Sequence, residues 1–243
     1  MRTKIIAILA LVFLTTSLSA QWGWKNRVKG SGDIETQERS VESRFTEVKS
    51  CCSMEVMITK GNERSVSIEA DDNILEYIET DFNGSRLTIR TSRGANIEPS
   101  QRVKVSITMP TIEGLYASSS SDLIAKGAFS GDELELDVSS SGEIMVDFTG
   151  SEVDIEGSSS GRIKLRGRAD VVKADLSSSS KIDATDFTAK RLKAEASSSG
   201  RISIEVTDEI DADVSSSGKV YYSGNPSKVF SDASSGGKVK KME

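Results

Sequence analysis

The chain has 243 residues, a formal net charge of −6, 36% hydrophobic residues and no histidine. Its acidic balance argues against nucleic acid or an anionic bilayer as a partner held by general electrostatics. Without histidine, a Ser-His-Asp hydrolase is excluded, and a zinc site is disfavoured because there is also no CxxC pair.

The first twenty residues have the pattern of a secretory signal peptide. Arg2 and Lys4 precede an apolar run, residues 5–14, and small polar residues then lead to Ala20. This run is too short to span a bilayer, and no later segment could cross one. We therefore predict a signal peptide over residues 1–20 and an exported protein, located in the periplasm, at the outer-membrane surface or outside the cell.

The next segment, residues 21–27, contains both tryptophans of the protein, Trp22 and Trp24. Disorder is the default beside a new N-terminus, so we expect a flexible segment or a cap on an open end of the fold. A binding arm is the alternative.

Residues 28–110 have a strand-like but irregular pattern. Alternation of apolar and polar residues over 64–70, 86–90 and 103–109 predicts three strands, with turn residues between them. Residues 71–77 are expected to form one helical turn, with Asp71 or Asp72 as its cap. We interpret this half as the same coil as the rest of the chain, begun with less regular turns.

Cys51 and Cys52 are the only cysteines. An oxidising compartment favours a disulfide, but adjacent cysteines can bridge only through a strained ring. The alternation of the later repeats would point Cys52 inward and Cys51 outward. We therefore favour Cys52 as a small buried apolar residue and leave open whether the two are bridged.

From residue 111 onward, a run of three or four small residues recurs seven times. We call the fourth residue of each run the anchor. The seven anchors are Ser121, Gly142, Gly161, Ser180, Gly200, Gly218 and Gly237. Their spacing of 18–21 residues, in a strand-rich sequence, is typical of a solenoid.

Apolar or small residues lie at even distances from the anchors, two after them and four, six and eight before them, except that Glu113 stands eight before the first anchor. The residues two after the anchors are Leu123, Ile144, Ile163, Ile182, Ile202, Val220 and Val239. A period of two indicates strands with one buried face, and stacking the repeats places like residues in rows roughly 4.8 Å apart. We predict an all-β parallel β-helix with coils of about 19–20 residues: a single domain over 28–243, irregular over 28–110 and built of seven Ser-rich repeats over 111–243.

The middle serine of each run, two before the anchor, has the parity of the inward side. We expect these hydroxyls to form a buried ladder, because an unsatisfied buried hydroxyl costs about 1–3 kcal/mol. Glycine at most anchors suits a corner that needs positive φ or a close backbone approach. No G-x-S-x-G motif surrounds any serine, so we assign the serines a structural role and no catalytic one.

One outward row is acidic. For every anchor except the first, the residue five positions before it is acidic. These residues, which we call the acidic column, are Asp137, Glu156, Asp175, Glu195, Asp213 and Asp232. Stacked carboxylates repel unless cations intervene, so the functional interpretation is a calcium-lined or sugar-binding stripe. The alternative, which we favour, is a solvated edge without a metal, because the calcium-binding phrase G-G-x-G-x-D is absent.

Another outward row lies one residue after each anchor and turns from acidic to basic along the chain. Its members are Asp122, Glu143, Arg162, Lys181, Arg201, Lys219 and Lys238. The repeats carry few aromatic residues that could stack on sugar rings, apart from Tyr116, Tyr221 and Tyr222.

Several stretches together resemble the exported bacterial family of auto-transporter adhesins with a head GIN domain, common in Bacteroidetes. They are residues 27–33, 68–78 and 220–226 and the repeated coil phrase. The resemblance implies a right-handed parallel β-helix, export and no established catalytic residue. One difference is that family coils usually read Gly-Ser-Gly-Asp, whereas these read Ser-Ser-Ser-Gly, which removes most of the aspartates on which a metal row would depend.

These observations favour a non-enzymatic, exported module for binding, adhesion or envelope structure, with no catalytic residue, cofactor or metal. The expected partner is a glycan or an envelope or surface protein; nucleic acid and a transmembrane segment are not expected, and the oligomeric state is open. One alternative is a carbohydrate-active β-helix enzyme of the lyase or glycosidase type. Another is a protein-interaction module that pairs through the open coil ends.

Overall fold

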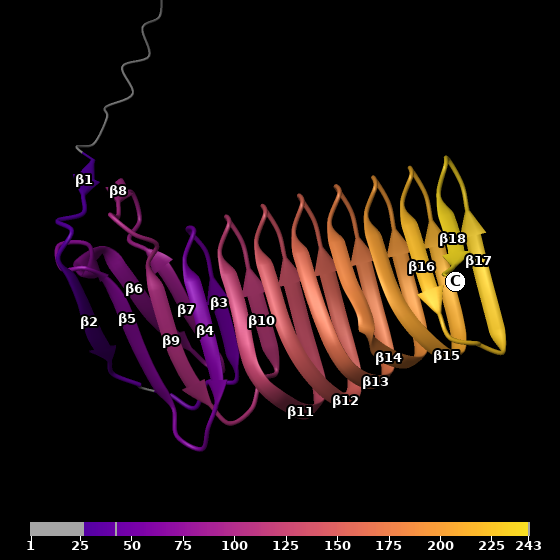
Figure 1. The fold of residues 1–243 in the computed structure, drawn as a ribbon, viewed down its shortest axis with the longest axis horizontal. Coiled ribbons are helices and arrows are strands. Elements are labelled where there is room, and N and C mark those ends of the chain that lie inside the picture. Colours follow the sequence, from indigo (N-terminus) through magenta and orange to yellow (C-terminus); the bar gives the residue numbers. More distant parts are fainter. Residues whose placement is uncertain (1–26, 42, 243) are drawn as a thin grey trace, which may run out of the picture.

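The computed structural model describes residues 27–41 and 43–242, and these form strands and one short 3₁₀ helix. The predicted signal peptide and all of the segment 21–27 except Arg27 lie outside the described residues. Within the described part, no helix is long and apolar enough to cross a membrane. The strands build one elongated solenoid whose coils follow one another along the chain (Figure 1).

The strands of the first half are short, whereas five strands of the repeats have 14–17 residues. Their bounds are β1 Val28–Lys29, β2 Ile34–Arg39, β3 Glu47–Ser50, β4 Glu55–Lys60, β5 Ser65–Asp71, β6 Ile78–Asn83, β7 Arg86–Thr91, β8 Ile97–Glu98, β9 Lys104–Met109, β10 Gly114–Ala117, β11 Asp122–Val138, β12 Glu143–Gly157, β13 Arg162–Leu176, β14 Lys181–Ala196, β15 Arg201–Val214, β16 Lys219–Ser223, β17 Lys228–Ala233 and β18 Lys238–Lys241. The 3₁₀ helix, η1, spans Leu75–Tyr77.

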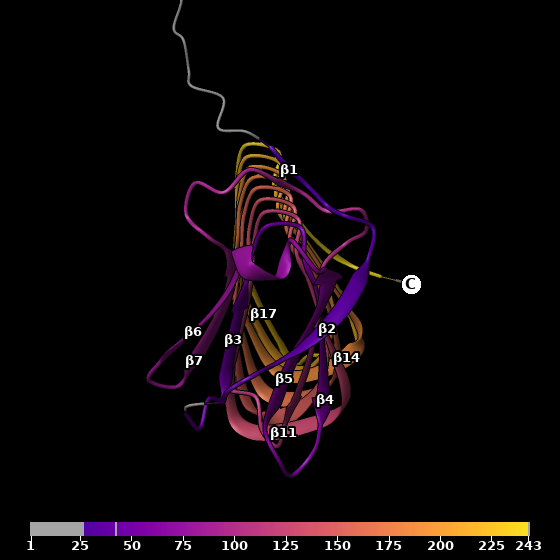
Figure 2. The ribbon, with the colours of Figure 1, turned by 90° about the vertical axis from the view of Figure 1, so that its left-hand side faces the viewer.

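Each long strand from β11 to β15 forms nearly a whole coil. It runs along one side, bends, and returns along the other side to a sharp corner, so the coil is flattened (Figures 1 and 2). Successive coils pair in parallel, with register shifts confined to the bends. The prediction of a parallel β-solenoid is confirmed.

The core consists of rows of like residues, as the even spacing predicts. Ile163, Ile182 and Ile202 are directly paired on neighbouring strands and are at most 2% exposed. At the bend, Phe129 pairs with Phe148, and both are buried. Each coil therefore buries its apolar side chains against the coils before and after it, which is the packing that defines a solenoid.

The corners are tight turns made by two serines. In the first copy, Ser119 and Ser120 have φ values of 51° and 62°, and the Ser121 amide donates to the Ser118 carbonyl at 3.1 Å. Two positive φ values with this hydrogen bond define a type I′ turn. The middle serines are therefore exposed at the turn, and the prediction of an inward serine ladder is wrong. A turn interrupts the strand alternation on which that prediction rested.

Serine is strained at positive φ, and the corners compensate through backbone hydrogen bonds between coils. The Ser141 amide donates to the Ser159 carbonyl at 3.1 Å, and the Ser160 amide donates to the Ser178 carbonyl at 3.0 Å. Equivalent bonds join every successive pair of serine corners. The corners lie in a line along one edge of the solenoid (Figure 1). We call their exposed serines the serine ridge: Ser119, Ser120, Ser140, Ser141, Ser159, Ser160, Ser178, Ser179, Ser198, Ser199, Ser216, Ser217 and Ser235.

The anchor after each turn sits against a backbone carbonyl of the preceding coil. A Cβ atom at Gly200 would lie 2.7 Å from the Leu176 carbonyl oxygen, which is closer than real Cβ atoms approach. The close approach predicted for the anchor glycines is confirmed, whereas the positive φ belongs to the serines before them.

Two anchors are serine, and each donates a hydrogen bond from its hydroxyl to the equivalent carbonyl of the preceding coil. Ser180 is buried and its hydroxyl donates to the Gly157 carbonyl at 2.8 Å, while Ser121 donates to the Ser50 carbonyl at 3.1 Å. Ser180 fits because Gly157 stands where other coils have a larger residue. Among the described residues of the repeats, the buried serines are therefore these two anchors.

The first half continues the same sheet but is only partly parallel. β3, β4, β7 and β9 form parallel pairs, while β2 with β5, β5 with β9, and β6 with β7 are antiparallel. The interpretation of this half as parallel coils is therefore right for part of it. The antiparallel β2 lies beyond β5 at the end of the sheet.

A short helical turn covers the N-terminal end of the core (Figure 2). The predicted turn over residues 71–77 is present as η1, but its N-cap is Ile74 with no side-chain hydrogen bond, so the predicted aspartate cap is wrong. Asp71 is instead buried and accepts hydrogen bonds from the Gly32 and Ser100 amides. These two bonds fix the first loop onto the end of the coil.

The C-terminal end has no such cover among the described residues. All of β17 is exposed, and Val229 and Phe230 are 42% and 56% exposed. The last coil therefore leaves apolar side chains and strand edges in contact with solvent.

We expect the last coil to open before the interior coils, because the stability of a solenoid is roughly a sum over neighbouring coils. In hydrogen exchange, amides of 228–233 should exchange much faster than those of 192–196 in β14. Uniform protection from 43 to 242 would contradict this.

The corners make a second prediction, tested by a matched pair of variants. Gly200→Ala should destabilise the protein by about 1–3 kcal/mol, because its Cβ is forced against the Leu176 carbonyl. Ser199→Gly, one residue earlier, should stay within about 1 kcal/mol of the parent, because glycine relieves the strain of a φ of 70°. Urea unfolding measures both, and equal losses would disprove this account of the corner.

Candidate functional site

The two outward charged columns flank the serine ridge on opposite sides of the flattened coil. Each acidic residue of the column lies two residues before a corner, and each basic residue of the other row directly follows a corner. Both rows therefore lie close to the edge of the solenoid that carries the serine ridge. We call the outer surface of 133–138 and its equivalents the acidic face, and that of 162–166 and its equivalents the basic face.

The six residues of the acidic column stack in register as predicted. Each pairs with the next on a neighbouring strand, from Asp137 and Glu156 to Asp213 and Asp232. All are exposed except Asp137, which is half-buried, and burial raises its pKa above the usual range. The structure therefore brings all six predicted site residues together.

The acidic face is hollowed beside this column into an open groove of about 400 Å³. Glu133, Glu152 and Asp154 approach one another there, with one oxygen of each within 4.8 Å of the others. Lys173 bonds Glu152 and lies 3.8 Å from Asp154, so the protein supplies its own cation at this point. Hydrogen bonding from Lys173 lowers the pKa of Glu152, whereas burial raises that of Asp154.

Tyr116 heads the acidic column but is not available to a ligand. It is 5% exposed, and its hydroxyl lies 2.6 Å from Glu135 Oε2 and 3.1 Å from Glu47 Oε2. The Arg86 guanidinium covers the ring at 4.0 Å from its centroid. Burial, with these carboxylates, raises the pKa of Tyr116 well above its usual range. The ring fills the space that Gly114 leaves two residues earlier on the same strand, β10.

Arg86 and Glu47 complete this cluster. Arg86 Nη2 lies 2.7 Å from Glu47 Oε2, and the Ser85 hydroxyl donates to Glu47 Oε1 at 2.5 Å. Burial alone would raise the pKa of Glu47, but the hydrogen bonds from Ser85 and Arg86 outweigh it and lower the pKa. The cluster joins the first half of the chain to the first regular coil.

The basic column is equally in register on the opposite face. Arg162, Lys181, Arg201, Lys219 and Lys238 are directly paired in succession on β13, β14, β15, β16 and β18. At strand spacing, five cations extend over roughly 19 Å. The Arg201 guanidinium lies 5.8 Å from the centroid of the Tyr221 ring, which is half-buried in the same face.

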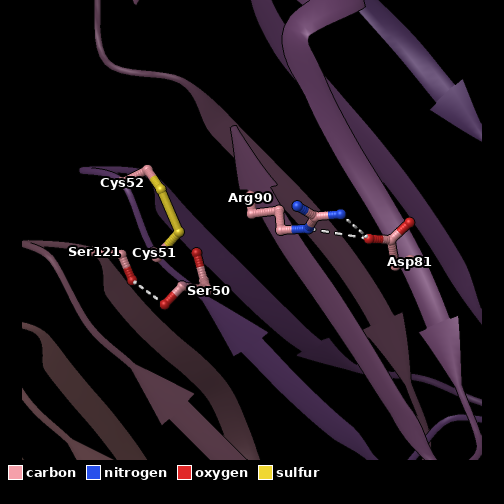
Figure 3. The surroundings of a disulfide bond; sticks show 6 residues. All are labelled: Ser50, Cys51, Cys52, Asp81, Arg90 and Ser121. Atoms are coloured by element: carbon pink, nitrogen blue, oxygen red, sulfur yellow. Dashed lines mark hydrogen bonds and ion pairs between the residues drawn. A yellow bond between two sulfur atoms is a disulfide. The ribbon is translucent and has the colours of Figure 1, made fainter. Parts of the chain in front are cut away.

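Cys51 and Cys52 form a disulfide at a corner of the first half (Figure 3). Cys52 and Ser53 have φ values of 70° and 59°, like the serine pairs of the repeats. Cys52 is therefore exposed at the turn, and the favoured interpretation of it as a buried apolar residue is wrong. The same oversight explains this error and the serine error, because both positions are in the turn.

Sequence reasoning missed the cluster around Tyr116. From the sequence, Tyr116 stands out only as one of the few aromatic residues that could stack on a sugar ring. Its signal was the pairing of a small residue, Gly114, with a large one two positions later. The partners Glu47 and Arg86 come from a distant, irregular part of the chain whose register the repeat does not predict.

The fold and the outward columns define a class: a β-solenoid whose exposed faces carry in-register rows of charge. A family model described as "Putative auto-transporter adhesin, head GIN domain" matches residues 44–226, so the chain belongs to that family. The resemblance noted from the sequence is confirmed. No curated protein matched the sequence.

Solved structures share this fold. A putative adhesin from Bacteroides fragilis NCTC 9343 is 20% identical, with a TM-score of 0.83 over 88% of this chain and 100% of that one. A putative adhesin from Parabacteroides merdae ATCC 43184 is 20% identical, with a TM-score of 0.72 over 90% and 100%. A putative lipid binding protein from Parabacteroides distasonis ATCC 8503 is 21% identical, with a TM-score of 0.69 over 90% and 100%.

The pKa of Glu47 yields a pH prediction. Because this pKa is lower in the folded protein than its ordinary value of about 4.3, the stabilisation is fully present above that pH and lost as the pH falls through the folded value. Glu47→Gln should lower the urea midpoint at pH 7, and its difference from the parent should shrink toward pH 3.

The control is Glu63→Gln, at an exposed residue that makes no ion pair among the described residues. It should leave the urea midpoint unchanged at both pH values. A Glu47→Gln deficit that is the same at pH 7 and pH 3 would show that the carboxylate charge contributes nothing to the cluster.

Proposed function

We propose that this protein is an exported, non-enzymatic adhesion module that binds glycans or other surface molecules through the outer faces of its solenoid. The observation that carries the proposal is the in-register stacking of exposed charged residues, from Asp137 to Asp232 on one face and from Arg162 to Lys238 on the other. A repetitive ligand can meet such a surface at many equivalent points, and many weak contacts then add.

Membership in the adhesin family supports a binding role over catalysis. The chemistry of the acidic groove supports the same choice, since Lys173 already lies among the carboxylates that could have served as a catalytic pair. Export rests on the pattern of residues 1–20 and on the family. We propose the acidic column as a solvated edge of the binding surface that holds no specific cation.

The open C-terminal coil favours a second candidate function. Phe230 and Val229 are exposed beside the unpaired edges of β17 and β18, and such edges invite strand addition. Pairing through this end with another envelope protein is compatible with adhesion through the faces.

A glycan array probed with the mature protein, with and without Ca²⁺, tests the proposal. We expect binding to a subset of glycans that Ca²⁺ does not change. Binding to none would contradict the adhesion role, and binding only with Ca²⁺ would contradict the solvated-edge assignment.

A thermal measurement separates the two assignments of the acidic column. If it is a solvated edge, millimolar Ca²⁺ at matched ionic strength should leave the melting temperature unchanged. A cation site would stabilise the folded state by about 2.7 kcal/mol at a hundredfold excess over Kd. A Ca²⁺-specific rise that is abolished in the variant Asp175→Asn with Glu195→Gln would overturn the assignment.

A further inference from the structure

The basic column is a row of cations that have no carboxylate partner among the described residues. Some other cations of the repeats pair with carboxylates on neighbouring coils, as in Lys190 with Asp170 at 2.7 Å and Lys228 with Glu209 at 3.4 Å. Among the described residues, none of Arg162, Lys181, Arg201, Lys219 and Lys238 makes an ion pair or a side-chain hydrogen bond. In a chain with 37 acidic residues against 31 basic ones, this row is not explained by a lack of carboxylates.

The residues around the column add to its charge. Lys164 and Lys240 lie two residues along from Arg162 and Lys238, on the same side of their strands, while Asp183 is the carboxylate at the equivalent place in β14. The part of the basic face from β13 to β18 is therefore positive, although the net charge of the whole protein is negative. Like charges at strand spacing repel one another, so a bound row of anions would relieve a cost that the free protein carries.

An aromatic ring lies within this positive surface. Tyr221 is half-buried between Ser203 on β15 and Lys240 on β18, and Arg201 lies over its ring at 5.8 Å. The ring is amphipathic and outward, in contrast with the enclosed Tyr116. A flat apolar surface beside cations suits a sugar ring that bears an anionic group.

We propose that the basic face binds a linear anionic polysaccharide, one whose sugar rings carry sulfate or carboxylate groups, laid along the solenoid axis beside the serine ridge. The five cations take its anionic groups and Tyr221 takes a ring face. This assignment rests on the proposed adhesion function and names the ligand class for one of its faces.

The geometry favours a single extended chain over two other anionic partners. Duplex DNA curves away from a straight row, so its backbone would meet only part of the column. The acidic column of a second copy of this protein would have the same spacing as the basic column, but it contains only carboxylates and so has no ring that could stack on Tyr221. Both partners are outcomes of the test.

Binding is measured with dextran sulfate and polygalacturonate as probes, and with uncharged dextran as the reference. We expect binding to both anionic probes and not to dextran, weakening steeply with salt as counterions are released. The variant Lys181→Gln with Arg201→Gln and Lys219→Gln should lose about tenfold to a hundredfold in affinity, since exposed ion pairs contribute up to about 1 kcal/mol each.

The matched control removes the same charge from elsewhere: Lys29→Gln with Lys49→Gln and Lys193→Gln, three exposed lysines outside the basic face. It should lose less than about threefold in affinity, a change that reflects net charge alone. Equal losses in the two triple variants would overturn the assignment of the basic face. Circular dichroism melting of both variants establishes that they are folded.

Tyr221→Ala distinguishes a sugar chain from any other polyanion. It should weaken binding of the two polysaccharides several-fold and leave binding of inorganic polyphosphate unchanged. Equal weakening for all three probes would overturn the ring-stacking role.

Three further outcomes contradict the proposal: no binding of either anionic polysaccharide, tighter binding of duplex DNA, or salt-sensitive self-association in sedimentation that the basic triple variant abolishes. A failure here would leave the adhesion function intact if the glycan array shows binding of neutral glycans. If the array also shows none, the adhesion function itself fails.

Discussion

The contact on which the rest of the structure depends is the one between each anchor and a backbone carbonyl of the preceding coil. Gly200 leaves room for the Leu176 carbonyl because it has no side chain, whereas the Ser180 hydroxyl donates a hydrogen bond to the Gly157 carbonyl. Either solution fixes the height of one coil above the last. Because the anchor directly precedes the next strand, the same contact sets the register of every residue that follows it in that coil.

Register then converts a short repeated phrase into surface properties. Once the anchors are aligned, residues at equal distances from them must lie in rows, whether they are apolar, acidic or basic. Inside, rows of isoleucine and phenylalanine gain from this because they bury one another. Outside, the acidic column and the basic column are placed under repulsion by the same alignment. Lys173 relieves part of it on the acidic face, and on the basic face Asp183 lies beside Lys164, while the five cations of the basic column make no ion pair among the described residues.

The sequence predicted the solenoid, its inward rows and the alignment of the acidic column because all three depend on a period that can be counted. It failed at the corners because a type I′ turn breaks the alternation of a strand, and two serines in succession give no glycine signal for positive φ. Cys52 was misplaced for the same reason. The contacts of Tyr116 with Glu47 and Arg86 could not be predicted, since they join a regular coil to a part of the chain that contains antiparallel strands and no fixed repeat.

The two ends of the solenoid face opposite physical problems. At the N-terminal end, Arg39 donates to the carbonyls of Leu75 and Ile78, and η1 closes the core, so the first coils are covered by the chain itself. At the C-terminal end, β17 and β18 leave unpaired edges and an exposed Phe230. Growth of the stack through its own repeats is therefore blocked at one end only. Any partner that pairs with a strand edge would meet the molecule at the last coil, which leaves both charged faces beside the serine ridge free for extended ligands.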